Sequence, residues 1–186
     1  MKVPVSPDVA FPFPVVLVGV KAGRRANFFT VSWITRGAAE PPAVVFCVDP
    51  AHFSTPWLLK HGEFSLNLPG RELVEKTDFC GIFSGQDVDK SKLFTVFYGA
   101  SAKAPMIAEC PVTLECAVIG TQELNGDLLV FGEIKAAHAE KTCADKGRAV
   151  IPKAGPLVWA GKHYWSLGED LGQGYSIGKR LAAKKN

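Results

Sequence analysis

The sequence predicts a mainly β fold, a barrel of short strands with a few short helices inserted between them. Short runs rich in Val, Leu and Phe recur along the chain, and Gly, Pro or Asn bound each of them. Two longer alternating runs meet at Asn125-Gly126-Asp127, a pattern typical of hairpin turns. Helical signals are confined to a few short segments. Several short strands with hairpin turns and only two or three short helices predict a mainly β barrel with helical insertions.

Length and composition indicate one globular domain over residues 1–186, because domains of roughly 100–200 residues are usual. Hydrophobic residues make up 47% of the chain and charged residues 21%, which excludes an intrinsically disordered protein. No apolar run reaches the roughly 18 residues that a membrane-spanning helix needs. The N-terminus also lacks the features of a signal peptide. We therefore expect a cytoplasmic protein that does not enter a membrane.

The net charge of +3 is concentrated at the C-terminus. Residues 179–186 hold four cations and no acid, so the remainder has 17 basic and 18 acidic residues, a net charge of −1. A nucleic-acid-binding face needs basic residues spread over a surface, and the body lacks that pattern. Residues 176–186 are predicted to be a solvated basic tail. An alternative left open is a binding module whose tail contacts nucleic acid or an acidic protein.

The cysteine pattern argues against a disulfide framework and against a structural metal. The five cysteines contain no C-x-x-C pair, and their number is odd. We expect them to be small buried hydrophobes. Thiol redox chemistry at Cys80 is the weaker alternative, since no cation adjacent in sequence would lower its pKa. The cysteines are Cys47, Cys80, Cys110, Cys116 and Cys143.

The N-terminal third is predicted to be an extended lead-in followed by a hairpin. Four prolines in residues 1–14 block both a helix and a central strand, so this segment should extend and pack Phe11 and Phe13 on the body. Residues 15–20 form a strand, residues 21–25 a turn, and residues 26–36 the returning strand.

The returning strand, residues 26–36, interleaves short polar side chains with bulky apolar ones. Strict alternation would place Phe28, Thr30, Ser32 and Ile34 on one face and Asn27, Phe29, Val31 and Trp33 on the other. Two hydroxyls beside a phenylalanine are unusual in a dry core and would suit a flat ligand with polar edges. The alternative is an edge or half-buried strand whose hydroxyls pair with neighbouring backbone.

The middle of the chain contains the helical insertions. After a third buried strand at 43–48, Thr55 is predicted to cap a helix that begins at Pro56 and ends before Gly62. The hydroxyls of Ser54 and Thr55 at a helix N-terminus suit an anion, although capping explains Thr55 equally well.

Residues 63–68 form a further strand, with Phe64, Leu66 and Leu68 on one face, and residues 72–80 a second helix. Residues 80–90 are predicted to be a flexible polar loop. Lys90 in this loop is either an anion ligand or a surface lysine paired with Asp87 or Asp89.

The C-terminal half is predicted to hold the longest strands. Residues 112–118 alternate, and the turn at 125–127 leads into a partner strand at 128–138. A short helix is expected around residues 143–150. The aromatic residues at 159, 164 and 165 lie outside any helical pattern, which suggests a segment laid over another part of the chain. Phosphate-loop, dinucleotide-binding and nucleophile-elbow motifs are absent from the sequence.

Seven elements in a fixed order carry a resemblance that spans Phe13 to Tyr175. They are Asn27 to Trp33, Pro41-Pro42, Phe53-Ser54-Thr55, Gly62 to Pro69, Cys80-Gly81 with Ser84-Gly85 and Asp89-Lys90, Cys110-Pro111 to Cys116, and Gly132-Glu133. Together they resemble the flavin-reductase-like FMN-binding proteins, specifically the flavoredoxin branch. The resemblance implies an FMN-binding split β-barrel, Greek-key-like with a few short helices, that forms a homodimer with FMN near the subunit interface.

The resemblance also implies which side chains bind FMN. The isoalloxazine and ribityl groups would be held by Asn27, Thr30, Ser32 and Trp33. The phosphate would be held by Ser54 and Thr55, and Lys90 would hold the flavin or its phosphate. Many relatives have histidine at Asp127, and an acid there would repel an anionic flavin. One ring of the Tyr164-Trp165 pair would lie near the cofactor. The full set is Asn27, Thr30, Val31, Ser32, Trp33, Ser54, Thr55, Lys90, Asp127 and Tyr164.

The implied function is electron or hydride transfer through bound FMN. Electrons would come from NAD(P)H or a redox protein and leave to free flavin, ferric iron or another carrier. Redox chemistry belongs to the flavin, so the chain needs no catalytic acid or nucleophile. The main alternative is a low-potential electron carrier without NAD(P)H activity. A more distant one is a non-redox module that binds an acidic partner through the tail.

Overall fold

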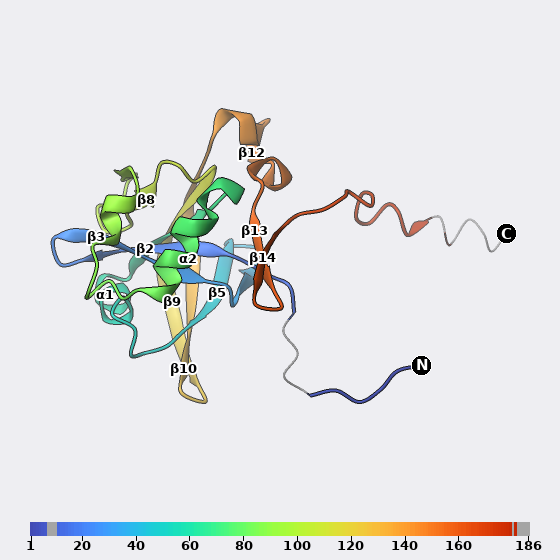
Figure 1. Cartoon of the computed structure of the whole chain (residues 1–186). Coiled ribbons are helices and arrows are strands. Elements are labelled where there is room, and N and C mark those ends of the chain that lie inside the picture. Colours follow the sequence, from blue (N-terminus) through green and yellow to red (C-terminus); the bar gives the residue numbers. More distant parts are fainter. Residues whose placement is uncertain (7–10, 180, 182–186) are drawn as a thin grey trace.

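The computed structural model describes residues 1–6, 11–179 and 181. Figure 1 shows a strand-rich body, with the helices α1 and α2 packed against it and the two terminal segments running away from it on the same side. The predicted mainly β fold is confirmed. Within the described residues, strands predominate and only two α-helices are present.

Among the described residues, seven antiparallel strands form the main sheet, in the order β3-β2-β6-β9-β10-β5-β4. Strands β3 and β4 stand at opposite edges of this order, yet Ser32 and Trp33 alone separate them along the chain. The sheet must therefore curl until its edges meet, which is the closure of a barrel. The strands are β2 Val16–Ala22, β3 Arg25–Val31, β4 Ile34–Ala38, β5 Ala43–Val48, β6 Glu63–Leu68, β9 Val112–Leu124 and β10 Asp127–Ala139.

Both predicted hairpins are confirmed. Strands β2 and β3 pair from Val16 with Val31 to Ala22 with Arg25. Strands β9 and β10 meet at Asn125 and Gly126, whose φ angles of 52° and 93° are those of a tight hairpin turn.

Three smaller sheets complete the strand set of the described residues. The first consists of β1 (Phe13–Pro14), β13 (Leu157–Ala160) and β14 (His163–Ser166). The second pairs β7 (Val96–Phe97) with β8 (Met106–Ile107), and the third pairs β11 (Ala144–Asp145) with β12 (Arg148–Ala149). Phe13 is half-buried as predicted, whereas Phe11 is 68% exposed, so its predicted packing on the body is wrong.

The helices differ from prediction in their ends. Helix α1 covers Thr55–His61 with Ser54 as N-cap residue, so the prediction of Thr55 as cap is wrong by one position. The second predicted helix begins as the 3₁₀ turn η1 (Arg71–Leu73) and continues as α2 (Val74–Ile82). The remaining 3₁₀ turns are η2 (Lys90–Leu93), η3 (Lys141–Cys143) and η4 (Ile151–Ala154). The helix expected around 143–150 is wrong, because those residues form the β11–β12 hairpin.

Strand β3 separates two hydrophobic clusters. Phe29 and Val31 belong to the larger one, which includes Phe46 and Phe64, whereas Phe28 belongs to a second cluster with Leu73 and Ile107. The predicted alternation of faces therefore holds within β3. The prediction of an edge strand is also confirmed, since β3 is the first strand in the order of the main sheet. The strand is, however, buried on both faces and not half-buried.

The alternation predicted beyond Val31 is wrong. The chain leaves the extended ladder at Ser32 and Trp33, and Ile34 then packs on the cluster of Phe29 and not on that of Phe28. A two-residue break between strands reverses the faces. Ser32 and Trp33, which form this break, line a surface cavity, and Trp33 is 58% exposed.

The cysteines are small hydrophobes, as predicted. All five are free thiols, and four are buried, while Cys47 is half-buried.

Candidate functional site

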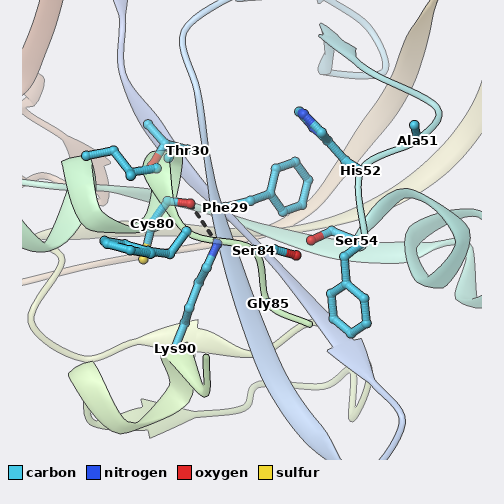
Figure 2. Close-up of a pocket in the computed structure, with 13 residues that line it drawn as sticks. Phe29, Thr30, Ala51, His52, Ser54, Cys80, Ser84, Gly85 and Lys90 are labelled. Atoms are coloured by element: carbon cyan, nitrogen blue, oxygen red, sulfur yellow. Dashed lines mark hydrogen bonds between the residues drawn. The ribbon is translucent and has the colours of Figure 1, made fainter. Parts of the chain in front are cut away.

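A continuous groove follows the C-terminal half of β3, and we call it the β3 groove. Its first cavity, of about 230 Å³, lies between β3, the turn before α1 and the loop after α2 (Figure 2). Its second cavity, also about 230 Å³, shares Phe29, Thr30 and His52 with the first and continues to Trp33 and Asp127. The groove therefore brings together four segments that are distant in sequence.

Lys90 supplies a buried positive charge to the first cavity. The side chain is 3% exposed, and its Nζ donates a hydrogen bond of 2.7 Å to the carbonyl of Cys80 (Figure 2). Burial lowers the pKa of Lys90, and the neighbouring Cys80 thiol opposes that shift. An ammonium group has three donors, so this one bond leaves capacity for a further acceptor. An anion in the cavity would offset the cost of burying the charge.

Two serine hydroxyls of the first cavity are oriented as donors. Ser54 Oγ accepts a hydrogen bond of 2.8 Å from Asn27 Nδ2, and Ser84 Oγ accepts one of 3.1 Å from the backbone N–H of Gln86. A hydroxyl that accepts a protein donor retains its own proton for another partner. Ser54, Ser84 and Lys90 therefore form a set of donors around one cavity, which suits an anionic group.

The local sequence explains why Ser54 faces the cavity and Thr55 does not. Ser54 is the N-cap residue of α1, but its hydroxyl makes no capping hydrogen bond. Thr55 Oγ1 instead donates to the carbonyl of Asp49 at 2.8 Å and is 1% exposed. The Thr55 hydroxyl therefore stabilises the turn between β5 and α1, and Thr55 is not among the residues that line the groove.

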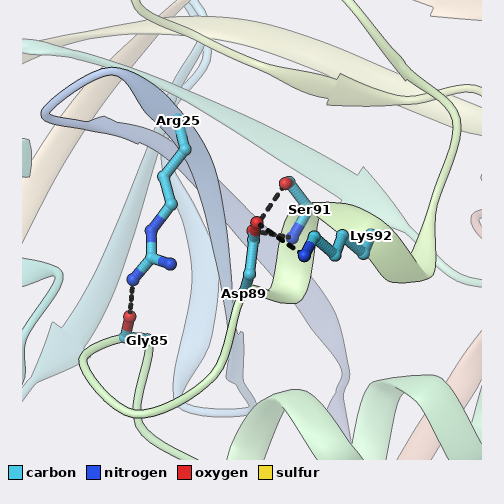
Figure 3. A network of polar contacts seen from close by, with 5 residues as sticks. All are labelled: Arg25, Gly85, Asp89, Ser91 and Lys92. Atoms are coloured by element: carbon cyan, nitrogen blue, oxygen red, sulfur yellow. Dashed lines mark hydrogen bonds and ion pairs between the residues drawn. The ribbon is translucent and has the colours of Figure 1, made fainter.

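The loop that carries Lys90 is held by its own polar contacts (Figure 3). Asp89 Oδ1 accepts from the backbone and hydroxyl of Ser91 at 3.2 Å and 2.6 Å, and Asp89 also pairs with Lys92 at 4.0 Å. The Ser91 hydroxyl bond lowers the pKa of Asp89. Asp89 thus caps η2, so the alternative prediction of Lys90 as a surface lysine is wrong.

The second cavity presents a different chemistry. Thr30 Oγ1 donates to the carbonyl of Thr77 at 2.5 Å, so it offers only lone pairs to the groove. A Cβ on Gly81 would lie 3.4 Å from Thr30, which shows how closely the last turn of α2 approaches β3. Trp33 is 58% exposed at the far end. The groove thus changes along its length from a donor-rich end to one where apolar side chains stand beside acceptor groups, including the carboxylates of Asp49 and Asp127.

The β13–β14 hairpin covers the side of the groove. A third cavity of about 140 Å³ lies between Thr30, Ser32, Trp159 and Tyr164. Tyr164 donates a hydrogen bond of 3.0 Å to Asp78 on α2, and burial together with that carboxylate raises the pKa of Tyr164. The prediction that the late aromatic segment covers another part of the chain is confirmed. Trp165, in contrast, is 58% exposed.

The structure brings most of the predicted site residues together. Those that line the groove are Thr30, Val31, Ser32, Trp33, Ser54, Lys90 and Asp127. Tyr164 lines the adjoining cavity. Asn27 and Thr55 are buried behind the lining. The sequence assigned no role to His52 or Ser84, which also line the first cavity; Ser84 stood within a resembling motif, whereas no motif pointed to His52.

Within the part of the chain that the structure describes, no group of three or more His, Cys, Asp or Glu side chains is placed to hold a metal ion. Over the same residues, none of the helices has the length and apolar character to cross a membrane.

Comparison with known proteins defines the class of this fold and site. The family model described as "Flavin reductase like domain" matches residues 9–168. The chain therefore belongs to the flavin-reductase-like family, and it is a flavoprotein of that type.

Within this family, the chain is similar to flavoredoxins. The flavoredoxin of Methanosarcina acetivorans is 38% identical, with a TM-score of 0.92 over 97% of this chain and 99% of that one. The flavoredoxin of Desulfovibrio vulgaris (Miyazaki F) is 28% identical, with a TM-score of 0.88 over 96% and 100%. An FMN-binding protein from Thermus thermophilus is 25% identical, with a TM-score of 0.80 over 93% and 97%.

The residues of the β3 groove fit a flavin. A flavin mononucleotide is anionic at its phosphate end and largely apolar at its ring, with polar atoms along one ring edge. The groove has hydroxyl and ammonium donors at one end and Val31 and Trp33 at the other. This match depends on the donor set and not on the fold alone.

Proposed function

We propose that the protein binds FMN in the β3 groove and transfers electrons or hydride through it. The observation that carries this proposal is the donor set of Ser54, Ser84 and Lys90 around one cavity. A phosphate monoester carries about −1.5 to −2 charges at pH 7 and accepts charge-assisted hydrogen bonds. The proposed phosphate site is therefore this cavity.

The proposed ring site is the second cavity. Val31 and Trp33 would contact the apolar part of the isoalloxazine, and Thr30 and Ser32 would face its polar atoms. Tyr164 would approach from the third cavity, which shares Thr30 and Ser32 with the groove. In this arrangement Asn27 and Thr55 support the site from behind and make no contact with the flavin.

We favour FMN over FAD because one cavity holds the whole donor set. That arrangement suits a single terminal phosphate better than a pyrophosphate that continues to an adenosine. The Thermus thermophilus protein, which is named for FMN binding, supports the same choice.

The flavin would supply the redox chemistry, and the chain would supply binding, orientation and access. A larger apolar cavity of about 540 Å³ adjoins the groove through Trp33, Cys47 and Asp127. We propose that an electron acceptor approaches through this cavity. The crystal structure of the Thermus thermophilus protein contains bound 1-cyclohex-2-enone. An apolar carbonyl compound should therefore be tested as an electron acceptor, in addition to free flavin and ferric iron.

We further propose a cytoplasmic homodimer. Exposed aromatic side chains such as Trp33 and Trp165 support an interface beside the groove. Five free cysteines suit a reducing compartment. Size-exclusion chromatography with light scattering tests the dimer, and a monomer at micromolar concentration would contradict it.

The proposed function is tested with the purified protein, stripped of any cofactor and titrated with FMN and with FAD. We expect FMN to bind with a shift of the flavin absorbance bands and to bind more tightly than FAD. Absence of binding would refute the proposal. Anaerobic mixing with NADH or NADPH then separates a reductase, which bleaches the flavin band, from an electron carrier, which does not. The donor is proposed to be NAD(P)H or a redox protein.

The tail alternative lies largely outside the described residues, which include only Lys179 and Leu181 of positions 179–186. Removal of residues 179–186 leaves the proposed flavin site intact, so FMN binding should persist. Loss of nucleic-acid or acidic-protein binding on truncation would favour the alternative.

A further inference from the structure

We infer that Asn27 is a positioning residue, which holds Ser54 and the loop at Gly85 at the spacing that a flavin phosphate requires without touching the flavin. This inference rests on the proposed FMN site. It reassigns a side chain that the family resemblance had placed against the ring.

Asn27 lies in β3, between two segments of the first cavity. The residue is 1% exposed, and its Nδ2 donates the 2.8 Å hydrogen bond to Ser54 Oγ. On its other side, the side-chain amide lies against Gly85, where a Cβ would overlap Oδ1, Cγ and Nδ2 of Asn27. One carboxamide therefore contacts both the turn before α1 and the loop after α2.

The loop is fastened to the same strand at a second point. Arg25, two residues before Asn27 and so on the same face of β3, donates a hydrogen bond to the Gly85 carbonyl (Figure 3). Four residues after Gly85, Asp89 caps the 3₁₀ turn in which Lys90 lies. The position of Gly85 on β3 therefore influences the position of the Lys90 ammonium group. Asn27 links this ammonium to the Ser54 hydroxyl.

The chemistry of the side chain matters as much as its size. An amide N–H directed at Ser54 Oγ occupies a lone pair of the serine, so the serine proton remains for the cavity. A carboxylate at position 27 would have nearly the same shape but would accept the serine proton instead. It would also place a negative charge behind the proposed phosphate site. Asn27→Asp therefore reverses the hydrogen-bond polarity with little change in packing.

The test compares FMN with riboflavin, which has the same ring and ribityl chain but no phosphate. Affinities of both are measured by quenching of flavin fluorescence in wild type, Asn27→Ala, Asn27→Asp and Ser54→Ala. A hydrogen bond to a charged group accounts for about tenfold in affinity, so Asn27→Ala should weaken FMN by about that factor. Asn27→Asp should weaken FMN more. Riboflavin affinity should change by less than about twofold, because a phosphate-specific hydrogen bond is the one removed.

A double substitution separates positioning from direct contact. If Asn27 acts through Ser54, then adding Asn27→Ala to Ser54→Ala should reduce FMN affinity by much less than the same change in wild type. An effect of Asn27→Ala on FMN affinity that is undiminished both in Ser54→Ala and in Lys90→Met, or an equal loss of riboflavin affinity, would overturn the inference. Thermal melts establish that each variant is folded. Where Asn27→Ala does not fold, Gly85→Ala tests the other contact, and unchanged FMN affinity in that variant would overturn the inference.

The outcomes also distinguish this inference from the function on which it rests. Wild-type protein that binds neither flavin refutes the proposed function itself. Wild-type protein that prefers FMN to riboflavin, with the same preference retained in Asn27→Asp, leaves the function standing and refutes only the role of Asn27.

Discussion

Two polar clusters of this protein, one built around the buried Ser54 and Lys90 and one around the buried Glu115, differ in whether the chain satisfies them. In the β3 groove, Ser54, Ser84 and Lys90 present donors to a cavity. The second cluster is centred on Glu115, which is 4% exposed and whose two carboxylate oxygens both have partners. Its Oε1 pairs with His138 Nε2 at 2.9 Å, and its Oε2 accepts from the backbone N–H of Ser101 at 2.8 Å.

A ligand site can be recognised from polar groups that the chain itself leaves without a full set of partners. A buried polar group without a partner costs free energy, so chains satisfy such groups unless an external partner does. The Glu115 cluster is complete and holds the loop around Ser101 against β9. The groove cluster has spare donors and one buried positive charge, so it needs an anion. Substitutions in the two clusters should therefore separate binding from stability.

The largest expected effect is on FMN binding by Lys90→Met. Removal of a buried ammonium that faces a phosphate should weaken FMN by about 100-fold, since charge-assisted hydrogen bonds contribute about 1.5–3 kcal/mol. The melting temperature should not fall, because methionine removes the cost of burying a charge. Isothermal titration calorimetry measures the affinity. Lys92→Met, whose side chain is 81% exposed, is the matched control and should bind FMN like wild type; equal losses in both variants would contradict the assignment.

Glu115→Gln should affect stability and not binding, in contrast to Lys90→Met. We expect it to lower the free energy of unfolding and to leave the FMN affinity unchanged. Replacement of a buried, fully partnered carboxylate should cost about 2 kcal/mol in the free energy of unfolding, measured by urea denaturation. The control is Glu133→Gln, which breaks a more exposed ion pair with Lys135 and should cost less than about 1 kcal/mol. A large loss of FMN affinity in Glu115→Gln would mean that the two clusters are not independent.

The stability difference between wild type and Glu115→Gln should depend on pH. Burial raises the pKa of Glu115, but the Ser101 N–H and His138 outweigh it, so the pKa lies below its ordinary value. The carboxylate then contributes stability above the ordinary carboxyl pKa of about 4.3, and this contribution is lost as pH falls through the lowered value. Wild type should therefore lose more free energy of unfolding than Glu115→Gln as the pH falls below about 4.3. Parallel losses in urea midpoints would contradict this.

The smallest expected effect is a gain on substitution of Asp127. This acid lines both the second cavity of the groove and the apolar cavity beyond it. Asp127→Asn removes a negative charge near an anionic ligand and should raise FMN affinity by about threefold at low salt, with a smaller gain at high salt. The same titration at two salt concentrations measures it. A weaker affinity would indicate that the Asp127 carboxylate accepts a hydrogen bond from the flavin.

The barrel could be predicted from the sequence because its signals are local. Alternating residues and the Asn125-Gly126 turn specify the long β9–β10 hairpin without reference to the rest of the chain. The region around residues 143–150 was mispredicted for the converse reason. Its two-residue strands are too short to show a periodicity, so nothing in the pattern distinguished a hairpin from a helix.

The candidate site could be predicted only in part, because its geometry depends on contacts across the chain. Resemblance identified Ser54 and Lys90, and both line the groove. Thr55 is turned from the cavity by its hydrogen bond to the Asp49 carbonyl, which no sequence pattern distinguished from capping. Asn27 is held by Ser54 and Gly85, which lie far from it in the sequence. His52 came from no motif, because only the turn before α1 brings it to the groove. Lys90 was ambiguous until the capping role of Asp89 was visible.

The phosphate site is best tested by the ratio of FMN affinity to riboflavin affinity in wild-type protein and in Lys90→Met. If the donor-rich cavity is a phosphate site, wild type should bind FMN at least about 100-fold more tightly than riboflavin, and Lys90→Met should reduce that ratio to within about tenfold. Equal affinities for FMN and riboflavin in wild type, or a ratio that Lys90→Met leaves unchanged, would contradict it.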